Sequence, residues 1–309
     1  MFSRTITRAA PAALAVALGA LALAGCASGD PLDTSTGGAP GDSTITIGNQ
    51  AFPESELLAQ IYGQVLAANG YDVEYEAGIG SRETFITALQ DGSIDMIPDY
   101  SGNALIFADP EATATSPEDV EAALPEALAP LGLAAAAAAP GEDSDALVVT
   151  PEFAAANDLS TIGDLAGLSQ AITLGANTEF EPRWRDGLAE VYGFEGWTFK
   201  AIDDYGGPGT LADLLAGAVQ VADIYTTTPS IAANDLVVLE DDNDLFAAQN
   251  VIPLFNSEIL TDEIAAIVDE VSAKITTQTL LELNARMAGD DKPSAAQVAK
   301  DWLTEQGLL

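Results

Sequence analysis

Hydrophobic positions along the chain alternate between two periods, and this alternation predicts strands separated by helices. Residues 44–48 alternate threonine with isoleucine, as a half-buried strand does, and over 54–69 apolar residues recur every three or four positions, which indicates a helix that ends at Gly70. The same order continues with a strand at 71–76, a helix at 81–90 and a strand at 94–97. A β-α-β-α-β order with short connections predicts a parallel sheet covered by helices.

The remainder of the chain repeats this alternation and closes with three helices. The pattern predicts helices at 118–129, 162–165, 184–192 and 211–216, strands at 132–139, 146–149, 171–174, 221–225 and 236–240, and final helices at 262–274, 277–288 and 294–306. No tandem repeat of the kind found in solenoids is present in the sequence. So many elements exceed one ordinary sheet, and the sequence therefore predicts two α/β lobes.

The first 43 residues have the composition of a targeting segment and a linker. Two arginines precede an apolar run over 9–24, which is typical of a secretory signal peptide. The run ends in Leu-Ala-Gly-Cys26, which resembles a bacterial lipobox, so we expect residues 1–25 to be removed and Cys26 to carry a lipid. The alternative is an ordinary signal peptide with an unrelated cysteine. Residues 26–43 are rich in Gly, Ser, Thr, Pro and Asp, which is typical of a flexible tether.

Composition then removes several classes of function. The 309 residues include 48 Asp and Glu, 10 Lys and Arg, one Cys and no His, for a formal net charge of −38. An acidic surface repels phosphate backbones, so no nucleic-acid partner is expected. The usual transition-metal sites, Ser-His-Asp triads and internal disulfides lack their residues, and neither a metal nor a cofactor is predicted. A binding protein, a structural protein or a carboxylate-dependent enzyme remains.

Several short segments, taken in order, resemble a known family of transport proteins. They are Ile47-Gly-Asn-Gln50, Pro98-Asp-Tyr-Ser-Gly102, Leu174-Gly175 with Glu179-Phe180, Leu236-Val-Val-Leu-Glu-Asp-Asp242, and the C-terminal 298–308. Across 44–309 they resemble the substrate-binding subunits of ABC importers for glycine betaine, choline and carnitine. The resemblance implies a two-lobed, type II periplasmic-binding-protein-like α/β fold with two crossover strands and a ligand cleft. Lobe one would comprise 44–144 and 239–309, and lobe two 145–238.

The resemblance also implies a cage of aromatic rings around a trimethylammonium group, because such a group has no N–H to donate. By position, Tyr100 and Tyr225 match two rings of this cage, one from each lobe. The alternative for each is a half-buried tyrosine at the end of a strand. Asp145 and Gln249 stand where the family has two further aromatic residues, so half of the cage is expected to be polar.

Polar and basic residues are implied at the other end of the ligand, where family members bind a carboxylate. Arg183 and Arg185 are the candidates, and either could instead form a surface ion pair. Gln50 and Asn103 stand where family members place polar groups that contact ligand.

The sequence therefore predicts a monomeric receptor, lipid-anchored to the outer face of the cell membrane, that delivers a small organic cation or zwitterion to an ABC-importer permease. It would catalyse no reaction, since closure of the lobes around the ligand is the mechanism. Because half of the cage is polar, a receptor for a different amine or amino-acid-derived solute is the alternative among binding proteins. A secreted carboxylate-dependent hydrolase is the alternative from another class.

Overall fold

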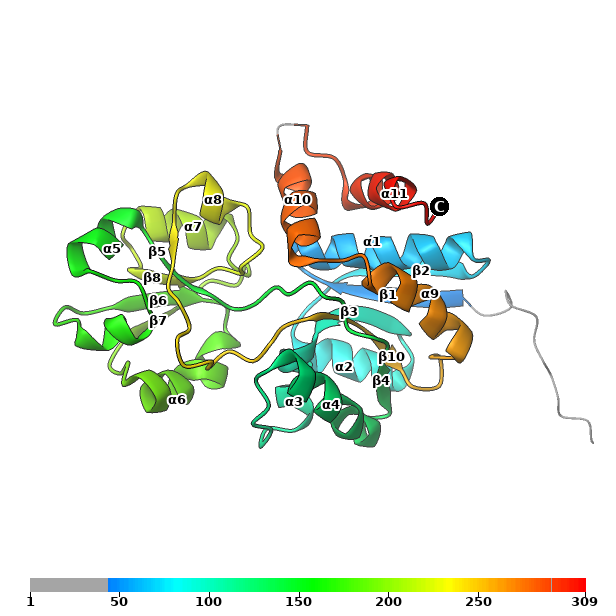
Figure 1. The fold of residues 1–309 in the computed structure, drawn as a ribbon, viewed down its shortest axis with the longest axis horizontal. Coiled ribbons are helices and arrows are strands. Elements are labelled where there is room, and N and C mark those ends of the chain that lie inside the picture. Colours follow the sequence, from blue (N-terminus) through cyan, green and yellow to red (C-terminus); the bar gives the residue numbers. More distant parts are fainter. Residues whose placement is uncertain (1–43, 290) are drawn as a thin grey trace, which may run out of the picture. The chain divides into compact units, whose positions relative to one another are not determined.

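The computed structural model describes residues 44–289 and 291–309, which form two five-stranded sheets with their helices (Figure 1). The predicted signal peptide, tether and lipidated Cys26 lie outside these residues. Within the described ranges, none of the helices combines the length and the apolar character needed to span a membrane.

The first sheet combines strands from both ends of the chain. Its strands are β1 (Thr44–Gln50), β2 (Asp72–Ile79), β3 (Met96–Tyr100), β4 (Leu133–Ala135) and β10 (Val251–Asn256), in the order β2-β1-β3-β10-β4. β1 pairs in parallel with β2 and β3, as predicted, but β10 runs antiparallel to both β3 and β4. The expectation of a purely parallel sheet is wrong at β10, because this strand returns from the second sheet and not through a crossover helix.

Helices cover both faces of the first sheet. One face carries α1 (Pro53–Ala68), α9 (Asp262–Ser272), α10 (Thr277–Ala288) and α11 (Ala295–Glu305), and the other carries α2 (Arg82–Asp91), α3 (Ser101–Ala108), α4 (Pro117–Leu128) and the 3-10 turn η1 (Ala129–Leu131). Side chains of β10 alternate between the two cores: Val251 and Phe255 enter the first, Ile252 and Leu254 the second. The apolar run in β10 thus reflects burial on both faces. We call this sheet and its helices the first lobe.

The second sheet is built from consecutive strands of the middle of the chain. These are β5 (Leu147–Val149), β6 (Thr173–Ala176), β7 (Thr198–Ala201), β8 (Val221–Asp223) and β9 (Val237–Val238), in the order β7-β6-β8-β5-β9. One face is covered by α5 (Pro151–Asn157), η2 (Gly163–Gly167) and α6 (Phe180–Tyr192), and the other by α7 (Pro208–Leu215) and α8 (Ser230–Ala233). We call this sheet and its helices the second lobe.

The chain crosses between the lobes twice, once between β4 and β5 and once between β9 and β10. The two crossing segments pair with each other: Asp143 N donates to Gln249 O at 3.1 Å, and Val251 N donates to Gly141 O at 3.0 Å. The expected two-lobed α/β architecture with two crossovers is therefore confirmed.

The hydrophobic pattern missed α3, α5, α8, β7 and β10. In β10 the reason is Pro253, since a central proline argues against an interior strand. The structure places Pro253 opposite Pro98 of β3. The bonds from Ser101 N to Asn250 O and from Asn256 N to Asp95 O make this a pair whose residues do not bond to each other, so neither proline removes a hydrogen bond between β3 and β10. Helix α3 is apolar on most sides, so it shows no amphipathic stripe. The predicted strand over 132–139 is confirmed only as the three residues of β4.

Gly102 at the start of α3 tests how tightly the returning segment packs on the first lobe. A Cβ atom at Gly102 would lie 2.6 Å from the backbone oxygen of Ala248, which cannot rotate away. We expect Gly102→Ala to lower the free energy of unfolding by about 1–3 kcal/mol in chemical denaturation, the range of overpacked sites. Gly80→Ala is the matched control, because nothing lies within 4 Å of its added Cβ. Equal stability of the two variants would contradict this packing.

Candidate functional site

Four aromatic side chains meet where the two lobes face each other. Phe52 caps α1 and lies with its ring centroid 6.3 Å from Tyr100, 5.6 Å from Tyr205 and 5.9 Å from Tyr225. Phe52 and Tyr100 belong to the first lobe, at the ends of β1 and β3. Tyr205 and Tyr225 belong to the second lobe, in loops before α7 and after β8. We call these four residues the aromatic cluster.

Local sequence explains how two of these rings are presented. Pro53 occupies the first position of α1, where its missing N–H costs nothing, so Phe52 stays extended at the turn between β1 and α1. Tyr205 has φ 54°, in the left-handed region that non-glycine residues adopt rarely. The following Gly206 and Gly207 complete this tight loop before α7. Backbone strain of this kind often accompanies functional positions.

Sequence analysis found Tyr100 and Tyr225 but missed Phe52 and Tyr205. The signal for Phe52 was available, because it lies two residues after Gln50 at the carboxyl end of a parallel strand, where ligands usually bind. Tyr205 lies in a loop between β7 and α7, and the hydrophobic pattern does not predict the conformation of a loop. The cluster therefore has four rings even though Asp145 and Gln249 contribute none.

A small cavity of about 20 Å³ borders the aromatic cluster and brings together most of the predicted site residues. It is lined by Gln50, Phe52, Arg82, Tyr100, Asn103, Asp143, Asp145, Glu179, Arg183, Tyr205 and Tyr225. Both lobes and the crossing segment contribute to this lining. Six of the eight predicted ligand-contacting residues are among them, and Gln249 and Arg185 are not.

Gln249 and Arg185 have other contacts. Gln249 is fully buried, and its Oε1 accepts a hydrogen bond from the backbone N of Asn103 at 3.1 Å, which supports the first turn of α3. Arg185 pairs with Glu181 at 2.5 Å, and its guanidinium lies 3.8 Å from the centroid of the Trp197 ring. Of the two candidate arginines, only Arg183 lies at the cavity.

Arg183 connects the two lobes at this cavity. Its Nη1 donates to Asn103 Oδ1 at 3.2 Å in the first lobe and to Asp145 Oδ2 at 3.3 Å, and its Nη2 donates to Glu179 Oε2 at 3.1 Å. Trp184 Nε1 also donates to Asp145 Oδ2, at 3.1 Å. The positive charge of Arg183 is therefore balanced by two carboxylates of the second lobe.

Arg82, which sequence analysis did not identify, is the second guanidinium at the cavity. Its Nη2 lies 2.6 Å from Asp99 Oδ1 and its Nε 3.3 Å from Asp99 Oδ2, and both residues are buried. The backbone N of Arg82 also donates to Glu179 Oε1 of the second lobe at 3.3 Å. Arg82 and Asp99 thus form an ion pair through two hydrogen bonds, in which Asp99 neutralises the charge of Arg82.

Glu54 joins the lobes beneath the aromatic cluster. The residue is 4% exposed and accepts hydrogen bonds from Tyr100 OH at 2.7 Å, from Thr227 Oγ1 at 2.6 Å and from Asn284 Nδ2. Thr227 belongs to the second lobe, whereas Tyr100 and Asn284 belong to the first. Burial, followed by the nearby Glu54 carboxylate, raises the pKa of Tyr100 well above its usual value, so the phenol stays a donor.

The buried carboxyl groups of Asp143 and Asp223 have strongly raised pKa values. Burial and then the Glu54 charge raise the pKa of Asp143, and burial and then the Asp145 charge raise that of Asp223. Among the described residues neither forms an ion pair with Lys or Arg. Both carboxyl groups therefore favour the protonated, uncharged form.

A second, larger cavity of about 530 Å³ lies on another side of the same aromatic cluster. It is lined by residues 51–54, 143, 203–208, 211, 225, 227–230, 284, 287 and 288. These come from the start of α1 and the end of α10 in the first lobe, and from the loops around α7 and α8 in the second. Phe52, Asp143, Tyr205 and Tyr225 line both cavities.

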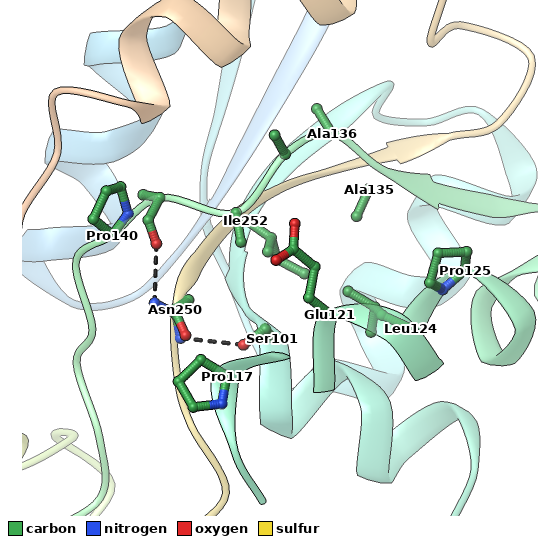
Figure 2. Close-up of a pocket in the computed structure, with 13 residues that line it drawn as sticks. Ser101, Pro117, Glu121, Leu124, Pro125, Ala135, Ala136, Pro140, Asn250 and Ile252 are labelled. Carbon is green, nitrogen blue, oxygen red and sulfur yellow. Dashed lines mark hydrogen bonds between the residues drawn. The ribbon is translucent and has the colours of Figure 1, made fainter. Parts of the chain in front are cut away.

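A cavity of about 410 Å³ in the first lobe contains none of the predicted site residues. Ala135–Ala139 line much of its wall, and Glu121 is the one charged side chain among its described lining residues (Figure 2). Asn250, which also lines it, donates its side-chain Nδ2 to Ala139 O and its backbone N to Ser101 Oγ. The cavity offers an apolar wall without a set of convergent polar groups.

Comparison with known proteins identifies what this chain is similar to. Residues 43–305 match the family model described as the substrate-binding domain of ABC-type glycine betaine transport systems. The chain is 26% identical over 284 residues to the glycine betaine-binding protein YehZ of Escherichia coli K12, covering 86% of this chain and 91% of the relative. It is 27% identical over 289 residues to a glycine-betaine-binding protein of Pseudomonas aeruginosa PAO1, covering 86% and 89%.

A solved structure supports the fold independently. The crystal structure of a glycine betaine/carnitine/choline ABC transporter protein superimposes with a TM-score of 0.68 at 23% identity, covering 86% of this chain and 98% of that one. At this identity the match establishes the two-lobed binding-protein fold.

The Arg82–Asp99 pair gives a stability test of the cleft wall. We expect Arg82→Met to lower the free energy of unfolding by about 3–5 kcal/mol, because it leaves Asp99 as an uncompensated buried charge. Adding Asp99→Leu should recover part of this loss. Arg286→Met is the control: its partners Asp301 and Glu305 lie at 3.5 and 3.9 Å on the surface, so the loss should stay below about 1 kcal/mol. Thermal and denaturant unfolding measure all three, and similar losses for Arg82 and Arg286 would contradict this view.

Proposed function

We propose that this chain, which belongs to the family of substrate-binding domains of ABC-type glycine betaine transport systems, is the extracytoplasmic receptor of an importer for a quaternary-ammonium osmoprotectant. The observation that carries the proposal is the aromatic cluster, in which rings from both lobes surround Phe52. A fully alkylated ammonium cannot donate a hydrogen bond, and the faces of aromatic rings are the groups that attract it in a desolvated site. Glycine betaine, choline and carnitine all carry this group.

In this proposal the four rings bind the cation, and polar residues bind the rest of the ligand. Phe52, Tyr100, Tyr205 and Tyr225 form the cage. Gln50, Asn103 and Arg183 offer polar groups around the small cavity. Asp145 acts mainly through Arg183 and Trp184, both of which donate to its Oδ2. Gln249 contributes by accepting a hydrogen bond from the backbone N of Asn103, and Arg185 pairs with Glu181.

Closure of the two lobes is the proposed mechanism. The first lobe comprises residues 44–144 and 239–309, and the second comprises 145–238. The contacts between the lobes from Thr227 to Glu54 and from Arg183 to Asn103 support it, because each joins a residue of one lobe to a residue of the other. A ligand that touches rings of both lobes adds contacts only when they are closed, and so shifts the equilibrium toward that state. A membrane permease would recognise the closed form. Members of this family are transport binding proteins, and we expect the ligand to be released unchanged.

Phe52 provides the sharpest test of ligand binding. Phe52→Leu keeps apolar bulk and removes the ring at the centre of the cluster. Loss of cation–π attraction of about 0.5–2 kcal/mol corresponds to a roughly 2- to 30-fold weaker dissociation constant. Isothermal titration with choline, glycine betaine and carnitine measures it. The matched control is Phe107→Leu, in the core on the α2–α4 side of the first lobe, which should retain affinity.

Two outcomes would count against the proposal. Wild-type protein that binds none of the three ligands would exclude a quaternary-ammonium receptor. Equal weakening by Phe52→Leu and Phe107→Leu would mean that the ring at Phe52 has no specific role.

We also propose that Cys26 carries a lipid that attaches the receptor, as a monomer, to the outer face of the membrane. The motif Leu-Ala-Gly-Cys26 after an apolar run supports this assignment. In cells that express the full chain, Cys26→Ala should move the protein from the membrane fraction to the soluble extracytoplasmic fraction. Ser28→Ala, two residues further on, is the matched control and should stay with the membrane. A Cys26→Ala protein that still sediments with membranes would disprove the anchor.

A further inference from the structure

Two buried carboxyl groups lie side by side in the second lobe, where the chain enters β5. β5 runs antiparallel to β8 with Leu147 opposite Asp223, and the ladder continues past β5, since Thr226 N donates to Ser144 O at 3.1 Å. Asp145 lies two residues before Leu147, so it is on the same face of the sheet and is a diagonal neighbour of Asp223. Asp145 is 5% exposed and Asp223 is 1% exposed. The two side chains therefore meet almost without access to water.

Each of these carboxyl groups has one oxygen with donors and one without. Asp145 Oδ2 accepts from Arg183 Nη1 at 3.3 Å and from Trp184 Nε1 at 3.1 Å, and Asp223 Oδ1 accepts from the backbone N of Ala146 at 3.2 Å. Within residues 44–289 and 291–309, no donor reaches Asp145 Oδ1 or Asp223 Oδ2. An ionised carboxylate only accepts hydrogen bonds, so two of them cannot satisfy each other. Two buried acceptors without donors would destabilise the fold.

A single proton removes both deficits. If Asp223 is protonated, its hydroxyl donates to the Asp145 carboxylate, and one bond uses the remaining oxygen of each residue. Burial and then the charge of Asp145 raise the pKa of Asp223, the nearby Arg183 lowers it, and the hydrogen bond with Asp145 raises it further. Because the two groups interact strongly, the proton belongs to the pair.

We propose that Asp145 and Asp223 share one proton, and that Asp223 is a positioning residue that holds the Asp145 carboxylate where it accepts from Arg183 and Trp184. Asp223 is not among the described residues that line the two cavities at the aromatic cluster. Its influence passes through Asp145 to Arg183, which donates to Asn103 of the first lobe. The inference concerns a proton in the second lobe and goes beyond the identity of the transported solute.

Other charged and titratable groups surround the pair and set its balance of charge. They are Arg183 and Glu179 on α6, Tyr225 after β8, Asp143 on the crossing segment and Arg82 across the smaller cavity. The strands that flank β8, which are β5 and β6, carry no titratable side chain. Arg183 already pairs with Glu179 as well as with Asp145, so it cannot neutralise a second aspartate.

Sharing a proton makes stability depend on pH in one direction. In the unfolded chain Asp223 loses its proton near the usual aspartate pKa of about 3.9. In the folded chain the pKa of Asp223 is raised, so the folded form holds one more proton in the window between the two values. The stabilising contribution of the pair is therefore complete below the unfolded pKa and is lost as pH rises through the folded pKa.

Denaturant unfolding of the ligand-free full chain at a series of pH values tests the shared proton. Asp223→Asn keeps the shape of the side chain, and its Nδ2 can donate to Asp145 Oδ1 without titrating. Across the window, the unfolding equilibrium constant of the wild type should rise about tenfold per pH unit relative to that of Asp223→Asn, because one proton separates them. Asp72→Asn removes the same charge at the exposed start of β2 and should keep the wild-type dependence.

Variants of Asp145 test whether the proton is shared and also provide for an Asp223→Asn chain that does not fold. Asp145→Asn removes the neighbouring charge and offers an N–H to Asp223 Oδ2, so the window should shrink toward acidic pH. The double variant should show no dependence beyond that of Asp223→Asn alone. Effects of the two changes that add up to two protons would mean that the groups titrate separately.

Tryptophan fluorescence tests the positioning role, because Trp184 donates directly to Asp145. Emission from the folded wild type should change as pH rises through the folded pKa of the pair, and that of Asp223→Asn should stay constant. Emission that stays constant in both would overturn the positioning role.

Parallel pH dependences of stability in wild type and Asp223→Asn would overturn the shared proton. None of these measurements uses a ligand, so their failure would leave the proposed receptor function intact. Absence of binding to choline, glycine betaine and carnitine would in turn leave the proton pair intact.

Discussion

A single buried carboxylate, Glu54, is the point on which the closed arrangement of the cleft depends. Three donors converge on it, from β3, from α10 and from the loop after β8, so one side chain joins two elements of the first lobe to the second lobe. No cation offsets its charge among the described ion pairs, and hydrogen bonds are therefore what make its burial tolerable. When the lobes separate, Glu54 loses its hydrogen bond from Thr227. Water can then bind the exposed carboxylate in place of Thr227, so opening of the cleft leaves no unsatisfied buried group.

The electrostatics of the cleft follow from how its two arginines are used. Each guanidinium is held by carboxylates, Arg82 by Asp99 and Arg183 by Asp145 and Glu179, so the arginines act as parts of the wall. The acidic groups that remain, Glu54 and Asp143, are buried and have no Lys or Arg partner among the described ion pairs. Hydrogen bonds from neighbouring side chains and backbone groups are what stabilise them.

The sequence predicted the features that depend on neighbouring residues and missed those that depend on loop conformation or on contacts between distant segments. The two-lobed α/β architecture followed from hydrophobic periods, which are local. Tyr100 and Tyr225 followed from their motifs, and the predicted ligand-contacting residues Asn103, Gln50 and Arg183 line the same small cavity. Phe52 and Tyr205 were missed because loop conformation, including the left-handed backbone of Tyr205, decides where they point. Arg82 was missed because its partner Asp99 lies on another element, and strand β10 was missed because Pro253 interrupts the strand pattern.

The central position of β10 also determines the order in which the molecule can assemble. β4 joins the first sheet only through β10, so it has no strand to pair with until residues 251–256 have been made. The strands of the second sheet all lie within 147–238 and can pair before residues 251–256 are available. A chain that emerges from its N-terminus thus favours an early second lobe and a first lobe that stays incomplete, because its last pairing closes a long loop. A nascent chain interrupted before β10 would expose the apolar edge of β3, which makes this stage the one most in need of chaperone protection.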